Sequence, residues 1–154
     1  MTNVYLPLAA MALLLAACTE KEPVLEPAVV PENAVQEVTK KNLVGTYLVT
    51  KVESAASGKR SDITTTWFSS YAGECAKDDI TEFKPDDSFV VQDGRIECDE
   101  STDDNGTWSL INKTRLKIDA DTATIEELTT KTLRIVSPIY STSQGAIIFT
   151  YTRQ

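Results

Sequence analysis

Apolar and polar residues divide the chain into three stretches. Residues 4–17 are apolar throughout, residues 19–42 mix acidic residues with prolines, and from Leu43 onward short runs rich in Val, Ile, Thr, Phe and Tyr are separated by turn residues. Such runs are typical of strands, and no segment of the third stretch carries a long 3.6-residue period. We expect strands over residues 44–53, 79–84, 88–93, 106–111, 114–119, 123–128, 133–137 and 146–152.

The connections between these strands are mostly short and rich in turn residues, as at Pro85-Asp86-Asp87 and Asn112-Lys113. This pattern predicts an all-β domain over residues 43–154, with eight antiparallel strands in up-and-down order. Closing such a sheet into a barrel removes its exposed edges, and a two-sheet sandwich is the alternative. A domain of this size buries roughly two-thirds of its unfolded surface, which supports an independent core.

The apolar stretch at the start resembles a bacterial lipoprotein signal peptide. A helix over residues 4–17 spans about 21 Å, which is short of the ~30 Å hydrocarbon core of a membrane. The stretch ends in Leu15-Ala16-Ala17-Cys18, which resembles the lipobox in which the cysteine is acylated. We therefore expect a signal over residues 1–17 and a lipid anchor at Cys18, although the first three residues lack the usual Lys or Arg.

Residues 18–42 are expected to form a lipid-anchored linker. Proline recurs at 23, 27 and 31 beside acidic residues, which favours extended, solvated chain. Residues 32–41 are compatible with a short helix that turns Val35 and Val38 toward the domain. Thr19 follows the cysteine where lipoproteins retained in an inner membrane often carry Asp. By resemblance to that sorting pattern we expect the outer membrane, at its periplasmic face or at the cell surface.

Charge and composition exclude several function classes. The net charge is −8 and histidine is absent, so nucleic acid is not an expected partner. Without imidazole, most hydrolase and zinc-site mechanisms lose their central group. The acidic run over residues 99–106 lacks the glycine and glutamate positions of a calcium loop. We expect no metal, no cofactor and no enzymatic activity.

An ordered set of short motifs carries a family resemblance. Gly45-Thr46-Tyr47 opens the domain and Gly106-Thr107-Trp108 lies in its middle, with Cys75, Asp78-Asp79, Thr81-Glu82-Phe83, Asp86-Asp87 and Cys98 between them. This order resembles the lipocalin-like domain of many small lipoproteins of Gram-negative bacteria. Tyr47 stands where lipocalin-type barrels commonly place Trp. The resemblance implies a small eight-stranded barrel with an apolar interior.

Two cysteines remain once Cys18 is assigned to the anchor. In an oxidising compartment, an even pair is expected to form a disulfide, here between Cys75 and Cys98. Two free thiols are the alternative.

Alternation along the strands predicts which side chains point into the barrel. The apolar residues at these positions are Tyr47, Val49, Phe83, Phe89, Trp108, Leu110, Leu116, Ile118, Leu133, Ile135, Ile147, Phe149 and Tyr151. An eight-stranded barrel is just wide enough to be packed solid or to hold one small ligand, and both interpretations stay open.

The connection over residues 54–74 is long enough to be a lid or a binding loop. It carries Trp67, Phe68 and Tyr71, of which Trp67 and Tyr71 share a face if the segment is helical. The candidate ligand-binding set is Tyr47, Trp67, Phe68, Tyr71, Trp108, Phe149 and Tyr151.

Two function classes follow from these expectations. In the first, an anchored envelope lipoprotein binds a small apolar or amphipathic molecule inside its barrel. In the second, the barrel is solid and its loops dock another envelope protein.

Overall fold

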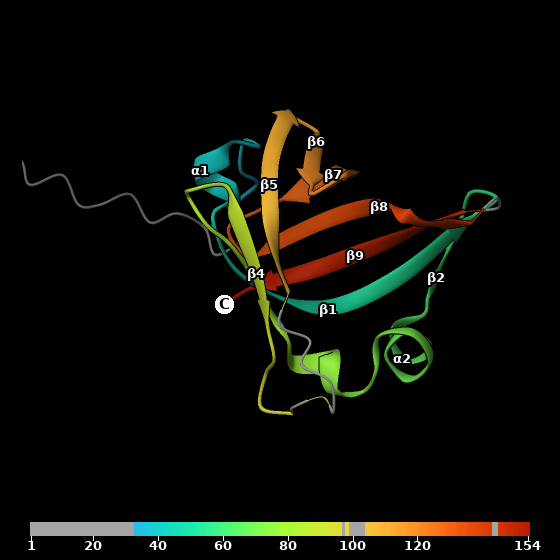
Figure 1. Ribbon diagram of the computed structural model, residues 1–154. Helices are drawn as coiled ribbons and strands as arrows, with labels where there is room; N and C mark the ends of the chain where they lie inside the picture. Colours follow the sequence, from blue (N-terminus) through green and yellow to red (C-terminus); the bar gives the residue numbers. More distant parts are fainter. Residues whose placement is uncertain (1–32, 97, 99–103, 143–144) are drawn as a thin grey trace, which may run out of the picture.

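The strands of the chain close into a barrel (Figure 1). The computed structural model describes residues 33–96, 98, 104–142 and 145–154. Eight antiparallel strands follow one another around the barrel, and the first pairs with the last to close it. They are β1 (Gly45–Ala56), β3 (Ile80–Phe83), β4 (Ser88–Gln92), β5 (Asp104–Asn112), β6 (Arg115–Ile118), β7 (Asp121–Leu128), β8 (Thr132–Thr142) and β9 (Gly145–Arg153). The predicted eight-stranded, up-and-down architecture is confirmed.

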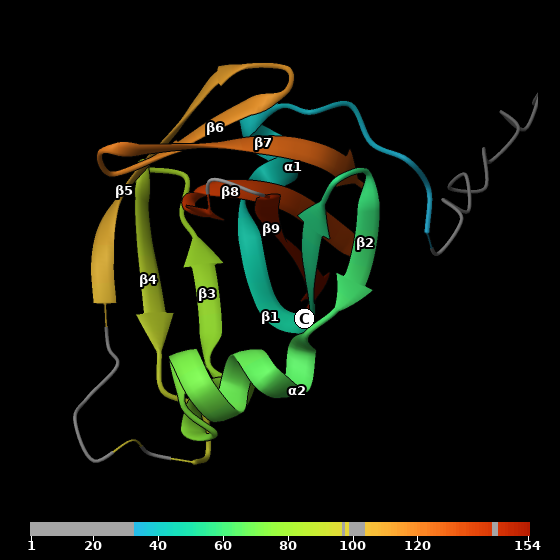
Figure 2. The same cartoon turned by 90° about the vertical axis from the view of Figure 1, so that its right-hand side faces the viewer.

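The predicted long loop between the first two strands contains regular structure. β1 continues to Ala56, and a turn leads into a ninth strand, β2 (Lys59–Asp62). β2 pairs with the last residues of β1, whereas β3 pairs with its first residues. The chain then forms α2 (Thr64–Trp67), the π-helical turn η1 (Phe68–Ala72) and the 3-10 turn η2 (Cys75–Asp78). Figure 2 shows α2 and these turns lying across one end of the barrel, with α1 (Lys40–Leu43) at the opposite end.

The helix considered over residues 32–41 is not found in the described part of that segment. Val35 pairs with Thr129 as an isolated bridge, and the Gln36 N–H donates to the Leu128 carbonyl over 2.9 Å. The end of β7 and the turn after it thus supply hydrogen-bond partners that a helix would otherwise supply, and in this segment only the residues from Lys40 onward are helical, in the turn Lys40–Leu43. Val35 is 85% exposed, while Val38 packs on the core.

Two β-bulges change which residues face inward. The register of β1 against β9 shifts between Val49 and Lys51, so that Thr50 is the extra residue. Without the bulge, strict alternation from Val49 would turn Lys51 and Glu53 into the barrel. With it, Val52 faces inward and is fully buried.

A second bulge has the same effect on β7. The register against β8 shifts between Ile125 and Glu127, which places Glu126 and Glu127 on the outer face and returns Leu128 to the core. Both bulges therefore keep charged residues out of the barrel interior.

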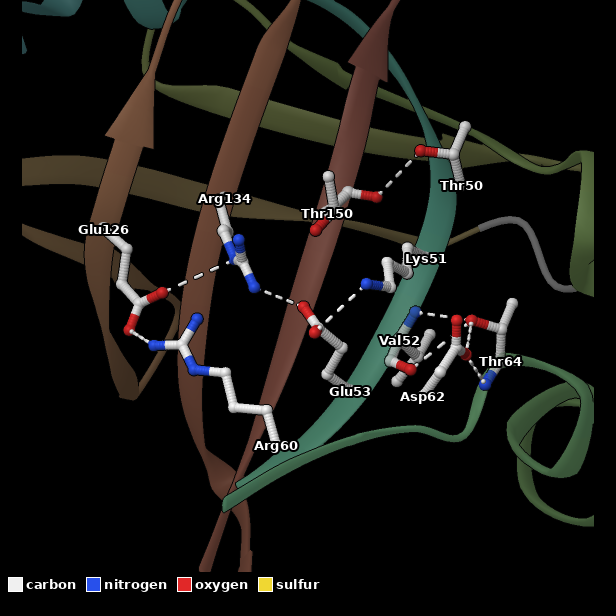
Figure 3. A network of polar contacts seen from close by, with 10 residues as sticks. All are labelled: Thr50, Lys51, Val52, Glu53, Arg60, Asp62, Thr64, Glu126, Arg134 and Thr150. Atoms are coloured by element: carbon white, nitrogen blue, oxygen red, sulfur yellow. Dashed lines mark hydrogen bonds and ion pairs between the residues drawn. The ribbon is translucent and has the colours of Figure 1, made fainter. Parts of the chain in front are cut away.

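The charged residues displaced by these bulges form an ion-pair network on the outer face (Figure 3). Glu53 pairs with Lys51 over 3.1 Å and with Arg134 of β8. Glu126 pairs with Arg134 over 3.5 Å and with Arg60 of β2 over 2.9 Å. Glu53 is only 7% exposed, so its carboxylate has lost most of its water. The positive partners compensate for that loss.

The predicted inward residues form the core or pack against it. The core includes Tyr47, Phe83, Phe89, Trp108, Leu116, Leu133, Ile135 and Phe149, with Val49, Leu110, Ile118, Ile147 and Tyr151 packed on it. No helix in the described part of the chain is long and apolar enough to cross a membrane.

Candidate functional site

One end of the barrel is closed by Tyr47. Its side chain is fully buried, and its hydroxyl donates to the Leu43 carbonyl over 2.9 Å. The Arg153 guanidinium lies 5.0 Å from the Tyr47 ring centroid and donates to the Tyr47 hydroxyl and to the Val44 carbonyl. Burial raises the pKa of the Tyr47 hydroxyl above its ordinary value, although Arg153 acts in the opposite direction. Tyr47 therefore joins α1, β1 and β9 at this closed end.

Trp108 closes the same end from β5. Its side chain is 2% exposed, and its indole N–H donates to the Lys84 carbonyl over 3.0 Å. Its ring meets that of Phe83 edge-on, with centroids 5.4 Å apart. Tyr47 and Trp108 were both predicted as ligand contacts. The structure places them in the packed closed end, where their polar atoms already have partners.

The opposite end is covered by aromatic side chains of α2 and η1, which we call the aromatic cap (Trp67, Phe68 and Tyr71). Trp67 is 9% exposed and meets Phe149 of β9 edge-on, with centroids 5.2 Å apart. Tyr71 stacks on the outer side of Trp67 at 5.6 Å and is 73% exposed. Phe68 is buried at 5% exposure. The predicted shared face of Trp67 and Tyr71 is thus confirmed.

The cap is held in place by the residues that precede it. The Thr64 N–H and hydroxyl both donate to an Asp62 carboxylate oxygen, over 2.9 and 2.7 Å. The Val52 N–H donates to the Thr64 hydroxyl over 2.9 Å, and the Ile63 N–H donates to the Val52 carbonyl. The hydrogen bond from the Thr64 N–H, and to a smaller extent that from the Thr64 hydroxyl, lowers the pKa of Asp62. These bonds fix the start of α2 against the middle of β1.

Burial of the inner wall changes along the barrel. At the closed end Tyr47, Phe83 and Leu133 are at most 3% exposed. The other inward register positions differ in burial: Val52, Phe149 and Ser137 are buried, whereas Val49, Thr81, Val91, Ile147 and Tyr151 are partly exposed. At the partly exposed positions Val49, Val91 and Ile147, the inner wall is less tightly packed than around Tyr47 and Phe83.

Some inner-wall residues were not predicted from the sequence. Val52 was missed because the bulge at Thr50 shifts the alternation, and no glycine or proline marks the bulge. Thr81 and Ser137 also occupy inward positions, since they pair with Tyr47 and Ile147. Both are small and polar, so a search for bulky apolar residues passes over them.

The cysteine pair lies beside the cap. Cys75 of η2 forms a disulfide with Cys98, with Cα atoms 5.4 Å apart, which confirms the predicted pairing. Nearby, Asp78 accepts from the Arg95 N–H over 2.7 Å and Asp79 accepts from the Gly94 N–H. The disulfide and these bonds join the segment after the cap to the segment after β4. Among the described residues, no group of three or more His, Cys, Asp or Glu is arranged to hold a metal ion.

The comparison with protein families agrees with this geometry. The model of the lipocalin-like domain matches residues 43–135, from the end of α1 into β8. The chain belongs to the lipocalin-like domain family. Lipocalin-like domains generally bind small ligands and are not enzymes. Searches of curated proteins and of solved structures found no match.

Proposed function

We propose that this lipocalin-like domain binds one small apolar or amphipathic molecule beneath its aromatic cap. The supporting observation is the partly exposed inner wall, where Val49, Val91 and Ile147 face the interior without being fully buried. Trp67 and Phe149 are in contact above this wall. A ligand that enters would separate the two rings and pack against both. Eight-stranded barrels are wide enough to hold one small ligand.

The binding proposal is tested with N-phenyl-1-naphthylamine, an uncharged probe whose fluorescence rises in an apolar environment. The unaltered protein should bind it with a saturable fluorescence increase. Trp67→Ala and Phe149→Ala should each weaken binding by about tenfold, because an aromatic contact is worth about 0.5–1.5 kcal/mol beyond its buried area. Ile111→Ala is the matched control, since Ile111 is 50% exposed at the bulge of β5.

Circular dichroism of each variant separates loss of the site from loss of the fold. Unchanged probe affinity in both folded cap variants would contradict the proposed location. No saturable binding to the unaltered protein would contradict ligand binding itself.

We also propose that the barrel is anchored in the cell envelope through acylated Cys18, at the outer membrane. The end of the linker contacts the barrel at its closed end, where Ala34 and Gln36 hydrogen-bond to the end of β7 and the turn after it. In the same turn, Lys131 accepts from the Arg153 N–H over 2.7 Å. These contacts lie at the end of the barrel opposite the aromatic cap.

The anchor is tested by mass spectrometry of the mature N-terminus. We expect loss of residues 1–17 and a diacylglycerol-modified cysteine, with membrane release of the Cys18→Ser variant. An unmodified Cys18 in the membrane fraction would contradict the anchor. Fractionation of inner and outer membranes tests the localisation, and recovery in the inner membrane would contradict it.

A further inference from the structure

We infer that the barrel takes an uncharged ligand and rejects anionic amphiphiles such as fatty acids. This inference rests on the proposed function, and it concerns the chemistry of the inner wall rather than the existence of a site. Three features of the described residues carry it: the side chains that line the wall, the placement of the basic side chains, and the charge at the rim beside the cap.

The inner wall offers apolar surface and hydroxyl groups. Its polar members in the described part of the chain include Ser54, Thr81, Ser137 and the Tyr151 hydroxyl at inward register positions, with Asp104 at the rim and Arg153 at the closed end. A hydroxyl can donate to a neutral oxygen or accept from a neutral donor. It does not supply the positive charge that a buried carboxylate or sulfonate needs after losing its water.

The basic side chains next to this wall are held outside it. The bulge at Thr50 turns Lys51 outward, where it pairs with Glu53 (Figure 3). Arg134, whose neighbours Leu133 and Ile135 face inward, points outward and pairs with Glu53 and Glu126. Lys51 and Arg134, which each lie one residue away from an inward position, are therefore paired with carboxylates on the outer face.

Arg153 occupies an inward register position opposite Tyr47, but it lies at the closed end, away from the aromatic cap, and its Nε is buried without a hydrogen-bond partner among the described residues. Its guanidinium donates to the Asn42 and Val44 carbonyls and to the Tyr47 hydroxyl at the closed end. Within the barrel domain, residues 97, 99–103 and 143–144 lie outside the described structure, and none of them is Lys or Arg. These segments add no cation to the barrel.

The rim beside the cap carries carboxylates. Asp104, the first residue of β5, pairs with Val91 at an inward register position and is exposed there. Asp78 and Asp79 lie at the β3 end of the same rim, bonded to the backbone of residues 94 and 95. With a net charge of −8 on the chain, an approaching anion meets repulsion before it meets the wall.

The test compares two fluorescent probes that share one ring system. N-phenyl-1-naphthylamine is neutral, and 1-anilinonaphthalene-8-sulfonate differs from it by a sulfonate. We expect the anionic probe to bind the purified protein at least ~10-fold more weakly, because an unpaired charge is costly to desolvate. The difference should persist in about 1 M salt, where the Debye length falls to about 3 Å and surface repulsion is screened.

A matched pair of variants assigns the rejection to the wall. Val91 and Val90 are neighbours on β4 and both are partly buried, but Val91 faces inward and Val90 outward. In an Asp104→Asn background, which removes the carboxylate opposite residue 91, Val91→Lys should raise the affinity for the anionic probe by about tenfold, in line with a charge-assisted contact of about 1.5 kcal/mol. Val90→Lys should leave it unchanged. Ile147→Lys places a cation on the same wall from β9 if Val91→Lys does not fold.

The outcomes separate this inference from the proposed function. Equal affinity for both probes, or an anionic affinity that salt restores to the neutral value, would overturn the inference. So would folded inward lysine variants that gain no more affinity for the anionic probe than Val90→Lys does. Failure of both probes to bind would instead contradict ligand binding as a whole.

Discussion

Tyr47 joins the helical turn before the barrel to the first and last strands. Its buried hydroxyl donates to the Leu43 carbonyl and accepts from Arg153. Tyr47→Phe should lower the free energy of unfolding by about 1–2 kcal/mol, because the Leu43 carbonyl and Arg153 lose a buried partner. Tyr71→Phe is the matched control, since Tyr71 is 73% exposed, and its unfolding free energy should be unchanged. Denaturant titration measures both variants, and equal effects would contradict the assigned role of Tyr47.

The same hydroxyl makes stability depend on pH at the alkaline end. Burial raises the pKa of Tyr47 in the folded protein above its ordinary value of 10.0, so ionisation favours the unfolded chain. Its contribution to stability is complete below pH ~10 and is lost as the pH rises through the folded-state pKa. In Tyr47→Phe the fall in unfolding midpoint above pH ~10 should be shallower. An identical fall in the variant would contradict this pKa shift.

At single positions, alternation predicted many of the bulky apolar residues that face inward. Phe83, Phe89 and Phe149 were placed in the interior, and the structure buries all three. The roles of Tyr47 and Trp108 were not predictable from alternation. An inward aromatic ring looks the same in sequence whether its polar atom meets a ligand or, as here, a backbone carbonyl or an arginine.

At the scale of the element, the bulge at Thr50 decides which side of β1 faces the core. Deleting Thr50 would remove the bulge and shift the part of β1 after it by one residue. That shift would turn Lys51 and Glu53 toward the interior and Val52 toward the outer face. Because unpaired buried charges are strongly unfavourable, we expect the deletion to prevent folding or to lower the melting temperature severely. Thr50→Ala keeps the residue count and should melt close to the unaltered protein. A deletion variant with unchanged thermal unfolding would contradict this role for the bulge.

The elements missed by sequence analysis share a physical reason. β2 is four residues long, exposed throughout and paired only with β1, so it carries no alternating apolar signal. α2 is a single turn, too short to show a helical period. Residues 33–39 were misjudged because their hydrogen-bond partners lie almost a hundred residues away, at the β7–β8 turn.

At the scale of the whole molecule, closure was predictable and the difference between the two ends was not. The two edge strands of an eight-stranded sheet expose unpaired backbone N–H and C=O groups. Pairing the first strand with the last, as β1 does with β9, is the simplest way to satisfy these groups. The sequence does not show which end is packed. That difference arises because Tyr47, Phe83 and Trp108 converge at one end, while a helical turn covers the other.

The central claim is that the barrel holds a small molecule beneath Trp67 and Phe149. Native mass spectrometry tests it most directly, after the purified protein has been incubated with a total lipid and metabolite extract of its host cell. We expect a retained adduct of defined mass, uncharged when released, that is lost in the folded Trp67→Ala and Phe149→Ala variants. A bare protein mass under gentle ionisation would contradict it and would favour a packed barrel that acts through a protein partner.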